Sequence, residues 1–179
     1  MARSKDIGTK AETAVVRYLQ TNGWPHAERR ALRGVADAGD ITGTPGLAWS
    51  VKGGIAAETA SDLDIIRWLG DLAKQRYNAN AEHGVLVLKR RQHSAARAGT
   101  WWAVLPAWDV THLVWPADLV YGPGEPPNPP CRMTLADAVG LLRGAGYGTN
   151  LPGDLRGEIV SDTYTQAVET GASLLRETS

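Results

Sequence analysis

Glu12, Asp40 and Lys52 are the residues of this sequence whose types and order could carry out chemistry. Glu12 falls on the apolar stripe of a predicted helix, because positions 12, 15, 16 and 19 follow the spacing of one helix face. A carboxylate on an inward face is costly unless it is paired or binds a metal ion. Two acids and a lysine suit metal-assisted phosphodiester hydrolysis. The carboxylates hold Mg²⁺, the ion polarises the phosphate and acidifies a water, and the lysine orients that water or neutralises developing charge.

The predicted elements bring these three residues together. Residues 5–22 predict a helix, which carries Glu12. Asp40 precedes the turn signal Gly43–Gly46, and an alternating strand follows over residues 47–52, so a hairpin is expected to bring Lys52 near Asp40. The alternation predicts one face of Leu47, Trp49 and Val51 and another of Ala48, Ser50 and Lys52.

The next elements define the fold class. Ser61-Asp62 is predicted to cap a helix that runs to about Asn80, and short strands are predicted at 85–89 and 100–105. The order helix, strand, strand, helix, strand, strand predicts an α/β protein with a mixed central sheet flanked by helices. The expected apolar stripe of the second helix is Ile65, Ile66, Leu69, Leu72, Ala73 and Tyr77.

A Pro/Gly-rich stretch, residues 122–130, predicts a linker without regular structure. It divides the chain into a core of residues 1–121 and a C-terminal helical extension of residues 131–179. Within the extension we expect a short helix that begins after Thr134 and ends at Gly144, and a second helix within residues 154–177.

The net charge of the chain is zero, which argues against a protein that binds DNA through bulk charge alone. Residues 1–100 nevertheless carry 15 Lys/Arg and 10 Asp/Glu, whereas residues 101–179 carry 4 and 9. If nucleic acid is the partner, the first part is expected to hold it. Six cations are candidates for phosphate contacts, with ordinary solvated faces as the alternative: Arg29, Arg30, Arg33, Lys89, Arg90 and Arg91.

Cys131 is the only cysteine, which excludes an intramolecular disulfide and a Cys-rich zinc site. No apolar run approaches the roughly 20 residues that span a bilayer, and the N-terminus lacks the apolar stretch of a secretory signal. We therefore expect no membrane partner and a reducing, cytoplasmic setting. Because the chain has seven Trp and no Phe, tryptophan is expected to be its large core residue.

Several short motifs of the first hundred residues occur together in a known family. They are Gly8-Thr-Lys-Ala-Glu12, Tyr18-Leu19, Gly23-Trp24, Glu28-Arg29-Arg30, Arg33-Gly34, Gly39-Asp40-Ile41 and Ser50-Val51-Lys52. With these motifs, residues 5–105 resemble the PD-(D/E)XK nucleases, and among them the Holliday junction resolvases of archaeal and phage kind. The resemblance implies an α-β-β-β-α-β nuclease core, a Mg²⁺ or Mn²⁺ requirement, and a homodimer that cuts two strands of a four-way DNA junction. It also implies that Glu12, Asp40 and the Val51 carbonyl bind the metal and that Lys52 is catalytic.

Ser50 departs from the family pattern, which has an acid two residues before the lysine. A hydroxyl is a poorer ligand for a hard cation than a carboxylate is. Three interpretations stay open: Ser50 acts through a water, another acid such as Asp37 or Glu58 replaces it, or the enzyme is weakened. Because Glu12 and Asp40 are both present, an active enzyme is the favoured interpretation.

The preferred hypothesis is therefore a metal-dependent, structure-selective endonuclease for branched DNA. A second hypothesis is a restriction-type or repair nuclease with the same core. A third, of another class, is a non-catalytic DNA-binding or assembly module that kept the fold and lost activity, for which Ser50 is the best argument.

Overall fold

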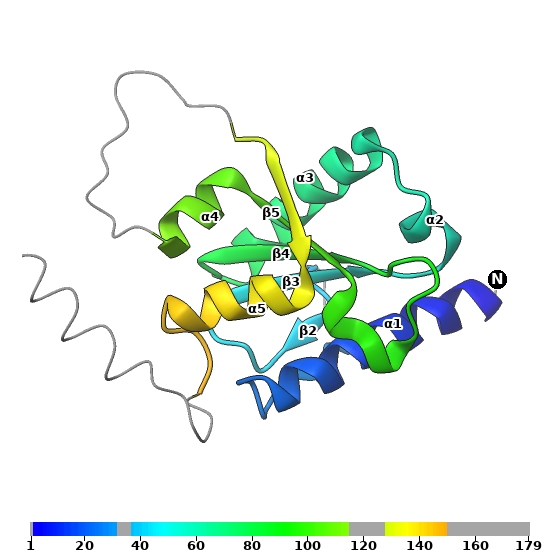
Figure 1. Ribbon diagram of the computed structural model, residues 1–179, viewed down its shortest axis with the longest axis horizontal. Helices are drawn as coiled ribbons and strands as arrows, with labels where there is room; N and C mark the ends of the chain where they lie inside the picture. The colour runs from blue at the N-terminus through cyan, green and yellow to red at the C-terminus, as the bar shows by residue number, and fades with distance from the viewer. Residues whose placement is uncertain (1, 32–36, 115–127, 150–179) are drawn as a thin grey trace, which may run out of the picture. The chain divides into compact units, whose positions relative to one another are not determined.

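The main feature of the fold is a mixed four-stranded sheet with helices on both faces (Figure 1). The computed structural model describes residues 2–31, 37–114 and 128–149. Its elements, in chain order, are α1 (Ala2–Thr21), β1 (Glu28–Arg29), β2 (Ile41–Thr42), β3 (Leu47–Lys52), α2 (Gly54–Glu58), α3 (Asp62–Asn78), β4 (His83–Leu88), the 3-10 helix η1 (Ala95–Thr100), β5 (Trp102–Pro106), α4 (Ala107–Val114), β6 (Pro130–Thr134) and α5 (Leu135–Gly144). The expected α/β class and the mixed sheet between helices are confirmed.

The main sheet has the strand order β3-β4-β5-β6. β3 and β4 run parallel, with Leu47 opposite His83 and Lys52 opposite Leu88. Parallel neighbours need a crossover connection, and α2 and α3 supply it. β5 and β6 then add antiparallel to β4 and to each other. The parallel pair ends at Lys52 and Leu88, so these two residues lie at the same edge of the sheet.

The hairpin expected between the Asp40 segment and β3 is only partly formed. β2 pairs antiparallel with β1 in a separate two-stranded sheet, with Arg29 opposite Ile41. The link to the main sheet is a backbone hydrogen bond of 2.8 Å from Asp40 N to Trp49 O. The prediction was wrong about the pairing because turn residues at 43–46 indicate a reversal of the chain but not which strand receives the ladder.

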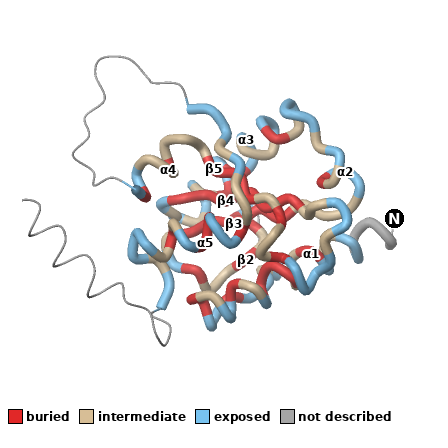
Figure 2. The backbone as a smooth tube through the Cα atoms, viewed as in Figure 1, coloured by how far each residue is buried: buried red, intermediate tan, exposed pale blue. Residues whose placement is uncertain are grey.

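The alternation of β3 is confirmed, because its two faces belong to two different cores. The strand is buried along nearly its whole length (Figure 2). Leu47, Trp49 and Val51 pack in a core with α1, α4 and α5. Ala48 packs in a second core beneath α3 with Ile65 and other residues. The prediction that tryptophan fills the core is confirmed for three residues that are at most 2% exposed, namely Trp24, Trp49 and Trp101.

Helix α3 begins as expected, because Ser61 and Asp64 form a capping box at its N-terminus. Its predicted buried stripe was only partly right. Ile65 and Leu72 are buried, but Ile66 and Tyr77 are 55% and 86% exposed. The helix carries two apolar stripes, and only tertiary packing decides which one faces the sheet.

The C-terminal part of the described chain joins the main sheet. Residues 130–134 form β6 on β5, and α5 is capped by Thr134 and ends at Gly144, as expected. Residues up to Thr149 thus belong to the same compact unit as the sheet, whereas a separate extension was expected from residue 131. The expected helix within 154–177 and most of the expected linker lie outside the described residues. No helix in the described part of the chain is long and apolar enough to cross a membrane.

The backbone conformation of Gly39 places Asp40 beside β3. Its φ is +90°, and a Cβ at this position would lie 2.8 Å from the Trp49 carbonyl oxygen. We expect Gly39→Ala to lower the free energy of unfolding by about 2 kcal/mol or more, through backbone strain and this clash. Urea denaturation followed by circular dichroism measures the loss. Gly140→Ala is the matched control, because a Cβ there meets nothing within 4 Å and the helical site should gain up to about 1 kcal/mol. Equal stability of Gly39→Ala and the wild type would contradict the prediction.

Candidate functional site

Asp40 is held at the edge of β3 by its backbone and by its side chain. Its N–H donates to Trp49 O at 2.8 Å, and its carbonyl accepts from Arg30 N at 2.8 Å. The Val51 N–H donates to Asp40 Oδ2 at 2.6 Å. Because the N–H and C=O of a strand residue point to the same side, the Val51 carbonyl also lies at this edge. Asp40 and the Val51 carbonyl, both predicted metal ligands, are therefore neighbours.

The surroundings of Asp40 disfavour its charged form. Burial raises the pKa of the Asp40 carboxyl above its ordinary value of 3.8, and the negative charges of Glu12 and Asp37 raise it further. The Val51 N–H and the Lys52 ammonium act in the opposite direction. Glu12, Asp37 and Lys52 thus all lie close enough to Asp40 to influence its charge. Two of the residues singled out from the sequence, Glu12 and Lys52, thus surround the third, Asp40, closely enough to act on its charge, and Asp37 does so too.

Glu12 approaches this group from α1. Its side chain is half-buried, and its Oε2 accepts a hydrogen bond of 2.8 Å from Arg29 Nε. A second Arg29 nitrogen donates to Thr9 Oγ1 at 3.3 Å. The inward placement predicted for Glu12 is therefore present, with Arg29 of β1 as its partner. Arg29 neutralises this carboxylate in the structure. The contact expected between Arg29 and a DNA phosphate therefore competes with an existing ion pair.

Ser50 and Lys52 share the face of β3 that lies under α3. Ser50 is fully buried, and its hydroxyl has no hydrogen-bond partner in the part of the chain that the structure describes. Lys52 is half-buried at the end of the strand. A buried hydroxyl without a partner carries a desolvation penalty, which a cation or water beside it would relieve.

Asp37 and Glu58, the two acids considered as replacements for the one absent at position 50, have different surroundings. Asp37 Oδ2 accepts a hydrogen bond of 2.7 Å from Gln75 Nε2, and its charge acts on Asp40. Glu58 forms an ion pair with Lys89. The geometry therefore favours Asp37 over Glu58 as an additional acid of the site.

Gln75 is the site residue that sequence reasoning underrated. A glutamine on an amphipathic helix is usually a surface residue, but Gln75 is 6% exposed and faces the sheet. Its Nε2 donates to Asp37, while its Oε1 is buried without a partner among the described residues. The signal was its spacing, since residue 75 follows Leu72 by three positions on the buried face of α3.

The six basic candidates do not form one free surface. Besides Arg29, Lys89 is paired with Glu58, and the Arg90 guanidinium lies 4.2 Å from the ring centre of Trp102. Arg30 has a buried Nε without a hydrogen-bond partner among the described residues, and Arg91 is exposed. Arg33 lies outside the described residues. The two basic clusters flank the acidic group in sequence, but two of their cations are already neutralised.

The oxygen atoms around Asp40 suit a hard cation that takes only a few of its ligands from the protein. Among residues 2–31, 37–114 and 128–149, no three His, Cys, Asp or Glu side chains are grouped as a ready metal site. Mg²⁺ is usually held by one or two carboxylates and keeps several waters. Asp40, the Val51 carbonyl and the unpartnered Ser50 hydroxyl supply oxygen only, which is the ligand type that Mg²⁺ and Mn²⁺ prefer.

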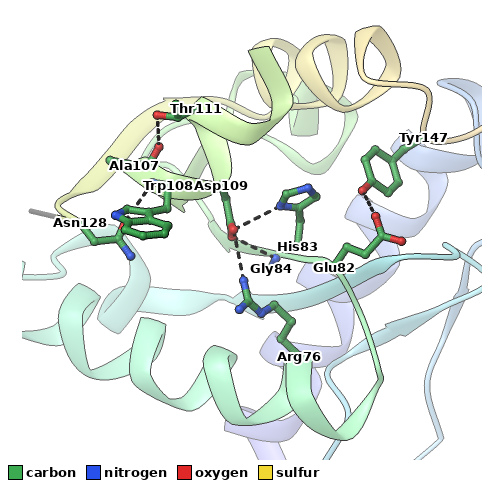
Figure 3. Close-up of polar contacts among 10 residues, drawn as sticks. All are labelled: Arg76, Glu82, His83, Gly84, Ala107, Trp108, Asp109, Thr111, Asn128 and Tyr147. Atoms are coloured by element: carbon green, nitrogen blue, oxygen red, sulfur yellow. Dashed lines mark hydrogen bonds and ion pairs between the residues drawn. The ribbon is translucent and has the colours of Figure 1, made fainter. Parts of the chain in front are cut away.

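A second polar cluster surrounds Asp109, at the other end of β4 (Figure 3). Asp109 is 4% exposed and accepts hydrogen bonds from Arg76 at 3.2 Å and from Gly84 N at 3.5 Å. The Nδ1 of His83 lies 3.2 Å from the same carboxylate. These contacts join α4 to α3 and β4. Because they compensate the buried charge within the protein, the cluster is explained as structural.

Comparisons of the chain with protein-family models, with curated proteins and with solved structures gave no match.

The raised pKa of Asp40 has a consequence for stability. The folded chain holds the Asp40 proton more tightly than the unfolded chain, so this group favours folding below about pH 4 and the contribution is lost as the pH rises through the folded-state pKa. Asp40→Asn keeps an oxygen for the Val51 N–H and removes the charge. We expect it to unfold at higher urea concentration than the wild type at pH 7, without divalent ions, and the gain to shrink toward pH 4.

Glu28→Gln, which removes an exposed carboxylate on β1, is the control and should show no comparable gain. A lower stability of Asp40→Asn than of the wild type at pH 7 would mean that the charged carboxylate is compensated in the folded protein.

Proposed function

We propose that this protein is a metal-dependent endonuclease that hydrolyses phosphodiester bonds of DNA, with branched DNA such as four-way junctions as its substrate. The observation that carries the proposal is that Asp40 is bound to the edge strand β3 and that the charges of Glu12, Lys52 and Asp37 all act on it. These residues come from α1, the segment before β2, and β3, which are far apart in sequence.

The order of the helices and strands also supports a nuclease. The order α1, β1, β2, β3, α3, β4 agrees with the α-β-β-β-α-β core that the resemblance implies, with the short α2 inserted before α3. Glu12 lies on the first helix, and Lys52 lies at the end of the third strand. A likeness of fold does not define a function by itself, so the proposal depends on the site.

Each residue has a role that its position allows. The Asp40 carboxylate and the Val51 carbonyl would hold Mg²⁺ or Mn²⁺, and Glu12 would add a second carboxylate. When bound, the ion polarises the scissile phosphate and lowers the pKa of a coordinated water. Lys52 donates hydrogen bonds to the attacking water or to the phosphate and neutralises charge that develops there. Arg29 must exchange its bond to Glu12 for one to phosphate if it is to contact DNA.

Asp37 compensates for the neutral residue at position 50. Gln75 Nε2 holds one Asp37 oxygen, and Asn78 Nδ2 donates to the Asp37 carbonyl at 2.8 Å. Both donors come from α3, so this helix fixes the acid beside Asp40. Asp37 thus supplies negative charge for a cation, directly or through a coordinated water, while Ser50 contributes at most a neutral oxygen.

Cleavage of a labelled four-way junction in Mg²⁺ or Mn²⁺ tests the proposed activity. We expect the wild type to cut the junction in preference to linear duplex of the same sequence. Asp40→Asn and Lys52→Ala should each lower the rate by about 100-fold or more, because each removes a group that stabilises charge in the transition state.

Two outcomes discriminate between the alternatives. Equal cutting of junction and linear duplex would favour a restriction-type or repair nuclease with the same core. If no substrate is cut by wild-type protein that binds DNA, the non-catalytic DNA-binding or assembly module is the better description.

Two measurements distinguish the roles of Ser50 and Asp37. One is Mn²⁺ binding, measured by calorimetry without DNA, and the other is the rate of DNA cleavage. We expect Asp37→Asn to weaken Mn²⁺ binding by about tenfold, because one charge beside the cation is lost. Ser50→Ala should change binding by less than about threefold and should impair cleavage less than Asp40→Asn does. Glu58→Gln also removes one carboxylate, from the acid that pairs with Lys89, so it is the matched control and should leave Mn²⁺ binding unchanged. A loss with Ser50→Ala as large as with Asp40→Asn would make Ser50 a principal ligand.

A further inference from the structure

A groove of about 590 Å³ lies between α1 and the 3-10 helix η1. Residues of α1 from Thr9 to Thr21 form one wall, and three alanines of η1 form the other. The two walls are fixed to each other, because Gly99 packs so closely on Tyr18 that an added Cβ would lie 2.6 Å from the ring. Since the alanine side chains are short, the space between the walls stays open.

The cations at this groove have no acidic partner in the described part of the chain. Lys10 and Arg17 line the groove from α1, and both are exposed. Arg97 lies on η1 between two of the lining alanines and is exposed as well. None of the three forms an ion pair with a described residue. They differ in this respect from Arg29 and Lys89, which are already neutralised by carboxylates.

The other groups at the groove leave binding to these cations. No Asp or Glu of the described chain lines it. Burial raises the pKa of the Tyr18 phenol above 10.0, and the charge of Asp137 adds to this effect, but Asp137 already accepts hydrogen bonds in the cap of α5. The hydroxyls of Thr13 and Thr21 donate to carbonyls of α1 itself. An anion in the groove is therefore held by Lys10 and Arg17.

The dimensions of the groove fit a polymer of phosphates. Lys10 and Arg17 lie about 10 Å apart along the helix axis, which corresponds to about three base pairs of a DNA strand. The whole wall from Thr9 to Thr21 is about 18 Å long, or about five base pairs. None of the large apolar side chains that are exposed in the described chain lines the groove, so it lacks the apolar anchor typical of a contact with another protein.

Both walls belong to parts of the chain that border the candidate site. Helix α1 also carries Glu12, whose charge acts on Asp40. η1 follows a loop that begins at Lys89, and the Lys89 N–H donates to Lys52 O at 2.9 Å. A DNA arm that leaves the group around Asp40 along α1 therefore meets the groove.

We propose that the groove between α1 and η1 binds the phosphate backbone of one strand of a duplex DNA arm, with Lys10 and Arg17 as the contacts. The inference rests on the proposed function for the identity of the ligand. It adds a binding surface apart from the acids, built from residues other than the six basic candidates of the sequence. Because contacts to phosphate carry no sequence information, this surface holds an arm without selecting its bases.

Fluorescence anisotropy with a labelled four-way junction, in EDTA so that nothing is cut, is the first test. We expect the double substitution Lys10→Gln and Arg17→Gln to weaken binding by about tenfold or more and to lower the salt dependence, log K against log salt concentration, by about two. The matched control is Arg67→Gln with Lys74→Gln, which removes two cations of α3 that are 66% and 80% exposed. It changes the net charge equally and should weaken binding by less than about threefold.

A substitution on the opposite wall tests whether the groove itself is occupied. Ala96→Glu places a carboxylate in the groove and should also weaken binding by about tenfold, because it repels phosphate. Gly140→Glu on α5 is its control, since this residue is exposed and an added Cβ there meets nothing within 4 Å. It should leave the affinity nearly unchanged.

The outcomes separate this inference from the proposed activity. Equal losses in a variant and its control would mean a general effect of charge and would overturn the inference, and unchanged DNA binding, expected if an acidic protein segment fills the groove, would do the same. Neither result bears on cleavage. Binding that depends on Lys10 and Arg17 in a protein that cuts no DNA would instead support the groove and overturn the nuclease. A wild-type protein that binds no DNA would overturn both.

Discussion

The hydrogen bond from the Val51 amide to the Asp40 carboxylate joins the two sheets of this protein at the candidate functional site. β1 and β2 pair only with each other, so the attachment of Asp40 to β3 determines where this small sheet is held. Arg29 on β1 in turn reaches Glu12 on α1. Helix α1 packs on β3 directly, so the Asp40 contact and the Arg29–Glu12 pair together hold the small sheet between α1 and the edge of the main sheet.

This attachment places a carboxylate where its charge is poorly compensated. Burial and two acidic neighbours oppose ionisation of Asp40, and Lys52 and one amide compensate in part. A fully buried carboxylate at position 50 would have added another desolvation cost, which the Ser50 hydroxyl avoids. The acid beside Asp40 is instead Asp37, which is exposed and held by a glutamine. The site thereby combines a buried acid with an accessible one.

Local signals in the sequence predicted much of the fold. Helix caps at Ser61 and Thr134 and the alternation of β3 depend on neighbouring residues, and all three are present in the structure. Pairing and burial depend on partners far along the chain. Thus β2 pairs with β1, and a strand begins at Pro130, inside a stretch whose composition suggested a linker. Proline has no backbone N–H to donate between strands, but the first residue of an edge strand does not need one. Pro130 is therefore compatible with β6.

The same distinction holds for the candidate site. The types and order of Glu12, Asp40 and Lys52 were visible in the sequence, as was the departure at Ser50. The partners that define their environment were not, because Arg29 is 17 residues from Glu12 and Gln75 is 38 residues from Asp37. A glutamine on an amphipathic helix looks like a surface residue until the position of the helix on the sheet is known.

Helix α3 connects two regions of the molecule that are otherwise separate. Its inner face carries Gln75, which fixes the carboxylate of Asp37, and its outer face carries the exposed apolar side chains of Leu63, Ile66 and Tyr77. A helix of this length moves as a nearly rigid body, so a tilt that improves packing on one side displaces the side chains of the other. A contact that shifted the outer face of α3 would therefore also shift Gln75 and the Asp37 carboxylate that it holds.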